Sequence, residues 1–167
     1  MLIKETILFN KEECELIINL SKINQQEWKS KDRKYNSFTL NYNSDTVWLF
    51  DKLKSLFELE TEIEILKLKP QIHFHRYVKG DWFDKHNDIR ENRVYAVGVL
   101  LNDNFDGGDF NLYNPNKQTL NKIIGNTYIF DVRIDHEITP ILDGERYSLL
   151  WFLQKEHINF KTTKSLI

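Results

Sequence analysis

The sequence predicts a mainly β domain, a jelly roll preceded by helices. From Ile63 onward apolar and polar side chains alternate, and β-branched and aromatic residues are frequent, which is typical of half-buried strands. Close turns divide this region into short segments at Lys79-Gly80, Asn102-Asp103, Asp106-Gly107-Gly108, Asn114-Pro115-Asn116 and Asp143-Gly144. Short strands joined by such turns favour antiparallel pairing, so we expect a jelly roll and not a parallel sheet with crossover helices.

A first helix is predicted near the N-terminus. Asn10 is a favourable N-cap, and the two glutamates shortly after it place negative charge in the first helical turn. Leu16, Leu20 and Ile23 then recur at helical spacing. We therefore expect a helix from about Lys11 to Asn24.

A second helix is predicted after a polar, charged stretch. Residues 25–34 are polar and charged. We expect the part from Trp28 to Lys34 to form a solvated loop, and a lid or a substrate contact is the alternative. Ser44 or Asp45 can cap the second helix, which is expected to end near Leu59. Its inward-facing residues are expected to be Val47, Phe50, Leu53 and Phe57.

The length and composition indicate one folded domain. A chain of 167 residues is long enough to bury a single core, and 41% hydrophobic with 13% aromatic residues argues against disorder. The helical part is expected at about residues 1–60 and the β core at about residues 61–155. Nothing in the sequence indicates an oligomeric state.

The charge and cysteine content disfavour several other classes. Lys and Arg (23) nearly balance Asp and Glu (25), so no global positive field attracts nucleic acid. The single Cys14 cannot form an internal disulfide, and no basic region followed by a long apolar one opens the chain, so we expect a cytoplasmic protein. The longest apolar runs, such as Val97 to Leu101, are too short to span a membrane.

Three side chains form a candidate metal site. His86 and Asp88 are two residues apart, and in an extended strand such residues point to the same face. His136 follows 48 residues after Asp88 at the start of another expected strand. Two histidines and one carboxylate are the facial triad of non-haem Fe(II) enzymes, which leaves coordination positions open. A His-x-Asp pair also occurs at solvated strand ends; structural zinc is disfavoured because only one cysteine is present.

A candidate anion site lies ten residues after His136. Arg146 and Ser148 share one face of an expected strand that is rich in apolar residues, so the guanidinium needs a partner. A guanidinium matches a carboxylate bidentately, and the hydroxyl of Ser148 is a further donor on the same side. The distal carboxylate of 2-oxoglutarate meets this requirement.

These motifs resemble the prolyl 4-hydroxylase-type 2-oxoglutarate oxygenases. The resemblance lies in the segments from His73 to Asp88 and from Leu100 to Phe110, and in His136-Glu137 and Gly144-Glu145-Arg146-Tyr147-Ser148. It covers roughly residues 63–153, and Phe9 to Ile17 is similar to the first helix of that family. The order, the spacing and the flanking residues all agree.

The resemblance implies a double-stranded β-helix with N-terminal helices packed on one sheet. It implies Fe(II) bound by His86, Asp88 and His136, and 2-oxoglutarate bound by Arg146 and Ser148 with a hydroxyl contact from Tyr77. It further implies O2, with ascorbate in a supporting role. The implied reaction is hydroxylation, most simply of a prolyl residue in a peptide or protein. The alternatives are a free amino acid or another small molecule as substrate, or a catalytically silent metal-binding domain of the same fold.

Departures from related patterns narrow the reaction class. Some relatives place a second tyrosine where this chain has Leu100, which predicts one hydrogen bond fewer to 2-oxoglutarate. Halogenating relatives replace the carboxylate ligand, so Asp88 favours hydroxylation. The nucleic-acid demethylating branch usually has a second arginine where this chain has Phe152. His73 and His75 alternate in phase with Tyr77, and the pattern allows either cavity-lining or core positions for them.

Overall fold

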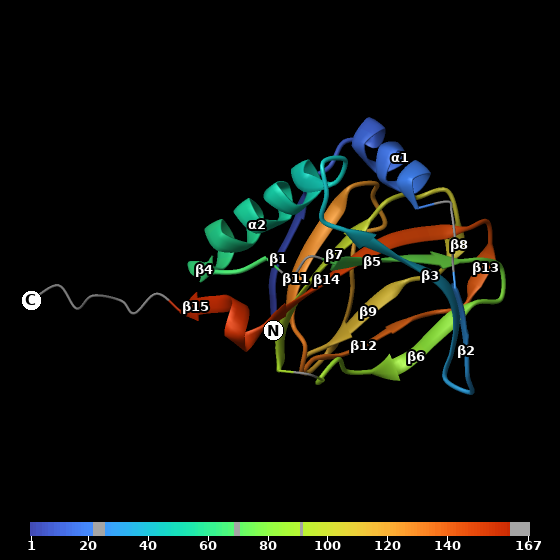
Figure 1. The fold of residues 1–167 in the computed structure, drawn as a ribbon. Helices are drawn as coiled ribbons and strands as arrows, with labels where there is room; N and C mark the ends of the chain where they lie inside the picture. Colours follow the sequence, from blue (N-terminus) through green and yellow to red (C-terminus); the bar gives the residue numbers. More distant parts are fainter. Residues whose placement is uncertain (22–25, 69–70, 91, 161–167) are drawn as a thin grey trace, which may run out of the picture.

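The computed structural model describes residues 1–21, 26–68, 71–90 and 92–160, which fold into a curled antiparallel sheet covered by helices on one face (Figure 1). This arrangement confirms the predicted jelly roll. The helices are α1 (Lys11–Leu20), α2 (Val47–Thr61) and the short η1 (Lys155–His157). The strands are β1 (Leu2–Ile7), β2 (Gln26–Lys29), β3 (Arg33–Asn41), β4 (Ile63–Ile65), β5 (Gln71–Tyr77), β6 (Trp82–His86), β7 (Arg93–Leu100), β8 (Asp106–Gly107), β9 (Phe110–Tyr113), β10 (Lys117–Thr119), β11 (Asn126–Asp131), β12 (Asp135–Ile138), β13 (Ile141–Asp143), β14 (Arg146–Gln154) and β15 (Ile158–Phe160).

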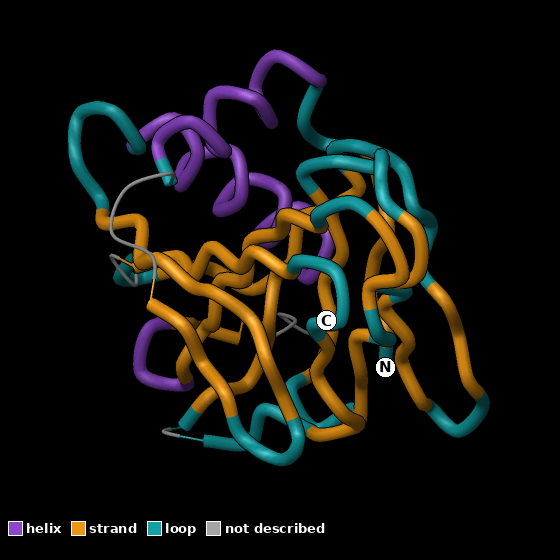
Figure 2. The backbone as a smooth tube through the Cα atoms, turned by 90° about the vertical axis from the view of Figure 1, so that its right-hand side faces the viewer, coloured by secondary structure: helices purple, strands orange, loops and turns teal. Residues whose placement is uncertain are grey.

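The main sheet follows a non-sequential order. Among the described residues its strands lie in the order β1-β11-β7-β14-β5-β3-β6-β12-β9-β10, and β2 pairs with β3. All pairings are antiparallel, and short two-stranded sheets join β13 to β8 and β15 to β4. The sheet curls (Figure 2), and strands β6, β9 and β12 share a cavity with β5 and β14.

Helix α1 begins where the sequence predicts. The side chain of Asn10 accepts a hydrogen bond from the backbone of Glu13, and the Glu13 side chain accepts one from the backbone of Asn10. This capping box satisfies two N–H groups that the helix would otherwise leave unpaired. The helix ends at Leu20, earlier than expected, and residues 22–25 lie outside the described part of the chain.

Helix α2 begins later than the sequence suggests, and the prediction of Ser44 or Asp45 as its cap was wrong. Its N-cap is Thr46, whose hydroxyl bonds to Asn43 and to the carbonyl of Asn41 and not to the helix. The chain therefore needs the turn after β3 before the helix can start. The helix continues to Thr61, two residues beyond the expected end. Neither described α-helix is long and apolar enough to cross a membrane.

The polar stretch predicted as a loop is largely a β-hairpin. Strands β2 and β3 pair with Trp28 opposite Tyr35 and Gln26 opposite Ser37; residue 25 lies outside the described part. The indole N–H of Trp28 donates to the hydroxyl of Ser37 at 2.6 Å. Pairing with β5 and β6 holds β3 in the sheet although its own sequence is polar. With β1, this hairpin gives strands as well as helices to the first 60 residues.

The two faces of the large sheet have different roles. Its outer face packs against α1 and α2 in a core that includes Cys14, Ile17, Leu53, Phe57, Phe74, Val97, Ile129, Leu149 and Trp151. Figure 1 shows both helices on this side. Because successive side chains of a strand alternate, the neighbouring residues of β5, β7 and β14 point to the opposite, inner face.

The packing of α2 gives a stability prediction. Leu53 is fully buried in this core, whereas Leu59 of the same helix is 75% exposed. We expect Leu53→Ala to lower the free energy of unfolding by about 2 to 5 kcal/mol, because a cavity is left. The matched control Leu59→Ala should change it by no more than about 0.5 kcal/mol. Urea unfolding measures both, and equal losses would contradict the assigned packing.

Candidate metal and cosubstrate site

The inner face of the curled sheet encloses a cavity of about 280 Å3. Side chains from β3, β5, β11 and β14 line one side of it, and side chains from β6, β9 and β12 line the other. The cavity contains all six residues predicted to bind iron or 2-oxoglutarate: Tyr77, His86, Asp88, His136, Arg146 and Ser148. Sequence positions up to 71 residues apart thus meet in one place.

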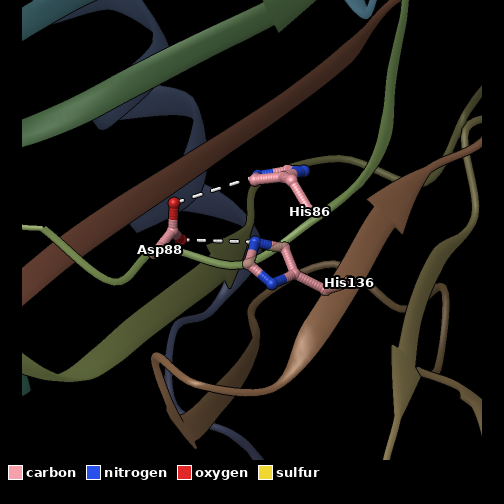
Figure 3. A group of neighbouring side chains, drawn as sticks. All are labelled: His86, Asp88 and His136. Carbon is pink, nitrogen blue, oxygen red and sulfur yellow. Dashed lines mark ion pairs between the residues drawn. The ribbon is translucent and has the colours of Figure 1, made fainter.

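Two neighbouring strands position the candidate metal ligands. His86 is the last residue of β6, and His136 lies directly opposite it on β12. Asp88 follows β6, where its backbone N–H donates to the carbonyl of Val132 at 2.9 Å. One possible ligand atom from each of the three side chains lies within 4.8 Å of the other two (Figure 3). The spacing therefore brings the side chains together as predicted, although Asp88 itself lies just outside the strand.

Backbone hydrogen bonds orient the two imidazoles. Nδ1 of His86 lies 2.7 Å from the carbonyl oxygen of Asp84, and Nδ1 of His136 lies 2.9 Å from that of Ile134. A carbonyl only accepts, so each Nδ1 carries the hydrogen and the neutral ring has its lone pair on Nε2. These Nε2 atoms lie 3.8 Å and 3.3 Å from the carboxylate oxygens of Asp88.

The three side chains fit a divalent cation. Three electron-pair donors converge, and Oδ2 of Asp88 is buried without a well-oriented hydrogen-bond donor. Hydrogen bonding of the second ring nitrogen to a backbone carbonyl is the usual support of a metal-binding histidine. An Fe(II) ion bound by His86, Asp88 and His136 would occupy this point and keep open positions.

Burial and neighbouring charges affect the protonation of the ligands. Burial lowers the pKa of His86, and the charge of His136 lowers it further, which favours the neutral ring that a metal requires. Burial alone would raise the pKa of Asp88. Contacts with the imidazoles of His136 and His86 and the positive charge of Arg93 outweigh burial and hold that pKa below its usual value.

Arg146 is a buried cation within the same cavity. It is 2% exposed, and one guanidinium N–H donates to the hydroxyl of Ser148 at 2.6 Å. Its Nε has no hydrogen-bond partner, and no carboxylate of the described residues forms an ion pair with it. A buried charge without a counter-charge is costly, so the residues present fit a bound carboxylate.

Two tyrosines complete the surroundings of Arg146. Tyr77 is paired with Arg146 across β5 and β14, and the guanidinium lies 5.6 Å from its ring centroid. Tyr128 on β11 was not identified from the sequence, yet it lines the same cavity, and the charge of Arg146 opposes the rise in the pKa of Tyr128 that burial causes. The feature of the sequence that could have indicated this tyrosine is Gly98 in the neighbouring strand, since a Cβ at this position would lie 2.1 Å from the ring of Tyr128. Tyr128 thus supplies a hydroxyl in a pocket where Leu100 provides none.

His73 and His75 both line the cavity, which decides between the two interpretations of their strand. His75 lies opposite Ser148 on β14 and opposite Ser37 on β3. Its ring is 4.9 Å from that of Tyr35. His75 and Ser148 form a polar wall between Arg146 and the far end of the cavity.

The chain belongs to the 2OG-Fe(II) oxygenase superfamily. The model of this family matches residues 72–154. The match spans β5 to β14, the strands that carry the site. The class of protein is therefore that of 2-oxoglutarate-dependent dioxygenases, which use Fe(II), 2-oxoglutarate and O2. This confirms the predicted family and its cofactors. No curated protein sequence is significantly similar to the chain.

Solved structures with the same fold include several prolyl hydroxylases. A Pseudomonas putida prolyl-4-hydroxylase has a TM-score of 0.75 at 16% identity, over 91% of this chain and 92% of that one. A Trichoplax adhaerens prolyl hydroxylase in complex with a peptide fragment of hypoxia inducible factor has a TM-score of 0.75 at 17% identity, over 92% and 84%. The viral collagen prolyl hydroxylase of Paramecium Bursaria Chlorella virus-1, in a 2-oxoglutarate complex, has a TM-score of 0.71 at 15% identity, over 89% and 93%.

The cavity wall gives a prediction on pH. Burial, and then the positive charges of His73 and Arg146, lower the pKa of His75 from 6.5 to about 3. The unfolded chain binds this proton near pH 6.5 and the folded chain only near pH 3, so this residue makes the folded state lose stability as the pH falls through that window. We expect His75→Asn to flatten the dependence of the unfolding free energy on pH between 6.5 and about 3. Urea unfolding at several pH values measures it, and an unchanged slope would contradict the burial of His75.

Proposed function

We propose that this dioxygenase hydroxylates a C–H bond of a prolyl residue in a peptide or protein. His86, Asp88 and His136 would hold Fe(II). Arg146 and Ser148, with a contact from Tyr77, would hold 2-oxoglutarate. Bound Fe(II) and 2-oxoglutarate supply the oxidation, in which one atom of O2 enters the C–H bond, the other enters succinate, and CO2 leaves.

The observation that carries this proposal is the buried guanidinium of Arg146, which forms no ion pair with a carboxylate of the described residues and lies in the cavity that also contains the three candidate ligands. A metal-binding domain without catalysis has no use for such a cation. A 2-oxoglutarate dioxygenase needs both a metal site and a cation for the distal carboxylate of the cosubstrate, and the two would be supplied here by the three candidate ligands and by Arg146. The 2-oxoglutarate complex of the viral relative supports this pairing of cavity and cosubstrate.

Each residue has a positioning role in the proposed reaction. Arg146 would hold the distal carboxylate through charge-assisted hydrogen bonds, while Ser148 fixes the guanidinium. Phe83 stacks on the imidazole of His86 with ring centroids 3.6 Å apart, which limits rotation of that ligand. Burial of the cavity wall excludes water from the reacting atoms.

The prolyl peptide is favoured over two other substrate classes. The solved prolyl hydroxylases, one with a bound peptide, support it by their similar fold. A nucleic-acid base is disfavoured because Phe152 stands where a second arginine would be needed, and its ring lines the cavity. A free amino acid is the second candidate, because Arg90 and Arg93 line the cavity whereas Arg76 is paired with Glu145 elsewhere.

The first test separates the two binding roles. We expect Asp88→Ala or His136→Ala to weaken Mn(II) binding strongly, because one of the three protein ligands is lost. Arg146→Leu should keep Mn(II) binding but weaken 2-oxoglutarate binding about tenfold or more, through loss of charge-assisted hydrogen bonds. Calorimetric titration measures both affinities. Unchanged metal affinity in the first pair, or unchanged 2-oxoglutarate affinity in Arg146→Leu, would refute the assignment.

The second test concerns the substrate. We expect proline-containing peptides incubated with the protein, Fe(II), ascorbate and 2-oxoglutarate to gain one oxygen atom, with an equal amount of succinate released. Mass spectrometry detects the gain, and Asp88→Ala is the inactive control. Oxygen gained by free proline alone would replace the peptide with the small-molecule candidate. If no succinate is formed with any of the substrates, a catalytically silent domain is favoured.

A further inference from the structure

The six arginines of the chain divide into two groups by their partners. Arg76 and Arg133 lie outside the cavity, and each forms a bidentate contact with a carboxylate, that of Glu145 and that of Asp131. The other four line the cavity: Arg33, Arg90, Arg93 and Arg146. Among the residues that the structure describes, no carboxylate forms an ion pair with any of these four.

Arg93 lies at the opposite end of β14 from Arg146. Its guanidinium is 3.7 Å from the ring centroid of Phe152, and its Nε is buried without a hydrogen-bond partner. Phe152 is six residues beyond Arg146 on the same strand, which corresponds to roughly 20 Å. A single 2-oxoglutarate bound to Arg146 cannot extend this far, so the cosubstrate does not account for Arg93.

Arg33 is held near the same cavity by the β2-β3 hairpin. Its guanidinium lies 5.6 Å from the ring of Trp28 and 5.3 Å from the ring of Phe83. Burial raises the pKa of Tyr35, and the charges of Arg33 and Arg90 oppose this effect, so both cations act on one point of the wall. Contacts with aromatic rings fix Arg33 in place before any ligand arrives, which lowers the entropic cost of binding.

The charges of the loaded cavity also do not sum to zero, because positive charge is in excess. Its lining has four arginines but two carboxylates, Asp32 and Asp88, so the protein contributes an excess of two positive charges when the histidines are neutral. Fe(II) and the dianion of 2-oxoglutarate cancel each other. The positive excess remains for whatever else the cavity binds.

We propose that Arg33, Arg90 and Arg93 bind a carboxylate of the substrate, next to the C–H bond that is hydroxylated. The substrate is then acidic, either a peptide with an acidic side chain beside the target residue or a free amino acid with its α-carboxylate. The inference rests on the proposed function, since Arg146 is assigned to 2-oxoglutarate there. Carboxylate is favoured over the phosphates of a nucleic acid because the chain as a whole carries a net charge of −2.

The test compares the binding of acids with that of their amides. The protein is loaded with Mn(II) and 2-oxoglutarate, so that the probes bind without turnover. One pair of probes is a capped peptide with proline between two glutamates and its counterpart with two glutamines. The other pair is free proline and prolinamide. We expect calorimetry to show at least about tenfold tighter binding of the acid in one pair, and the pair that responds identifies the source of the carboxylate.

Three variants locate the effect. Arg93→Gln should remove the preference for the acid, and Arg93→Lys should keep part of it because the charge remains. Arg133→Gln, a matched change outside the cavity, should leave the preference intact. We expect all three variants to keep the affinity for 2-oxoglutarate. This measurement is the control that each variant is folded.

Several results would overturn the inference. These are equal binding of acid and amide in both pairs, absence of binding by all four probes, and tighter binding of a single-stranded oligonucleotide than of either acid. If the unmodified protein loads Mn(II) and 2-oxoglutarate normally in such a case, the proposed function stands and the acidic substrate alone is rejected. Failure to load either one overturns both.

Discussion

The alternation of side chains along β14 is the constraint on which both the fold and the site depend. Leu149, Trp151 and Leu153 point to the helices and are buried in the main core, whereas Arg146 and Phe152 point into the cavity. A shift of one residue in the pairing with β5 or β7 would move the guanidinium into the apolar core and the indole into the cavity. Hydrophobic packing under the helices therefore fixes the position of a charged group on the other face.

The charged groups of the inner face are arranged to bind ligands. The two Nε2 atoms and the carboxylate of Asp88 meet at one point, and Arg146 has no acidic partner in the described chain. Such an arrangement of buried charges is costly without ligands and favourable when a cation and an anion fill the cavity. The polar wall of Ser148 and His75 joins the two points without adding a fixed charge near neutral pH, since the pKa of His75 is lowered.

Residues with local signatures could be predicted from the sequence, and residues defined by long-range contacts could not. The i and i+2 spacing identified His86 with Asp88, and the capping box identified the start of α1. The hairpin from Gln26 to Asn41 has a polar sequence that indicates a loop, and only its pairing with β5 and β6 makes it part of the sheet. Tyr128 shares the cavity with Arg146 only through the curling of the sheet, and its one local sign in the sequence is a glycine in the neighbouring strand.

The hairpin also shows how the substrate end of the cavity can be specific without disturbing the cosubstrate end. It is tied to β6 by a backbone hydrogen bond of 2.7 Å between Asp84 and Asp32, and Lys34 forms an ion pair with the buried Asp81. The first contact joins backbone atoms and the second lies in the turn before β6, whereas the side chains of Arg33 and Trp28 line the cavity. Changes of the cavity-facing side chains of β2 and β3 therefore alter what enters beside the metal, while the strands that carry Arg146 and the three candidate ligands keep their register.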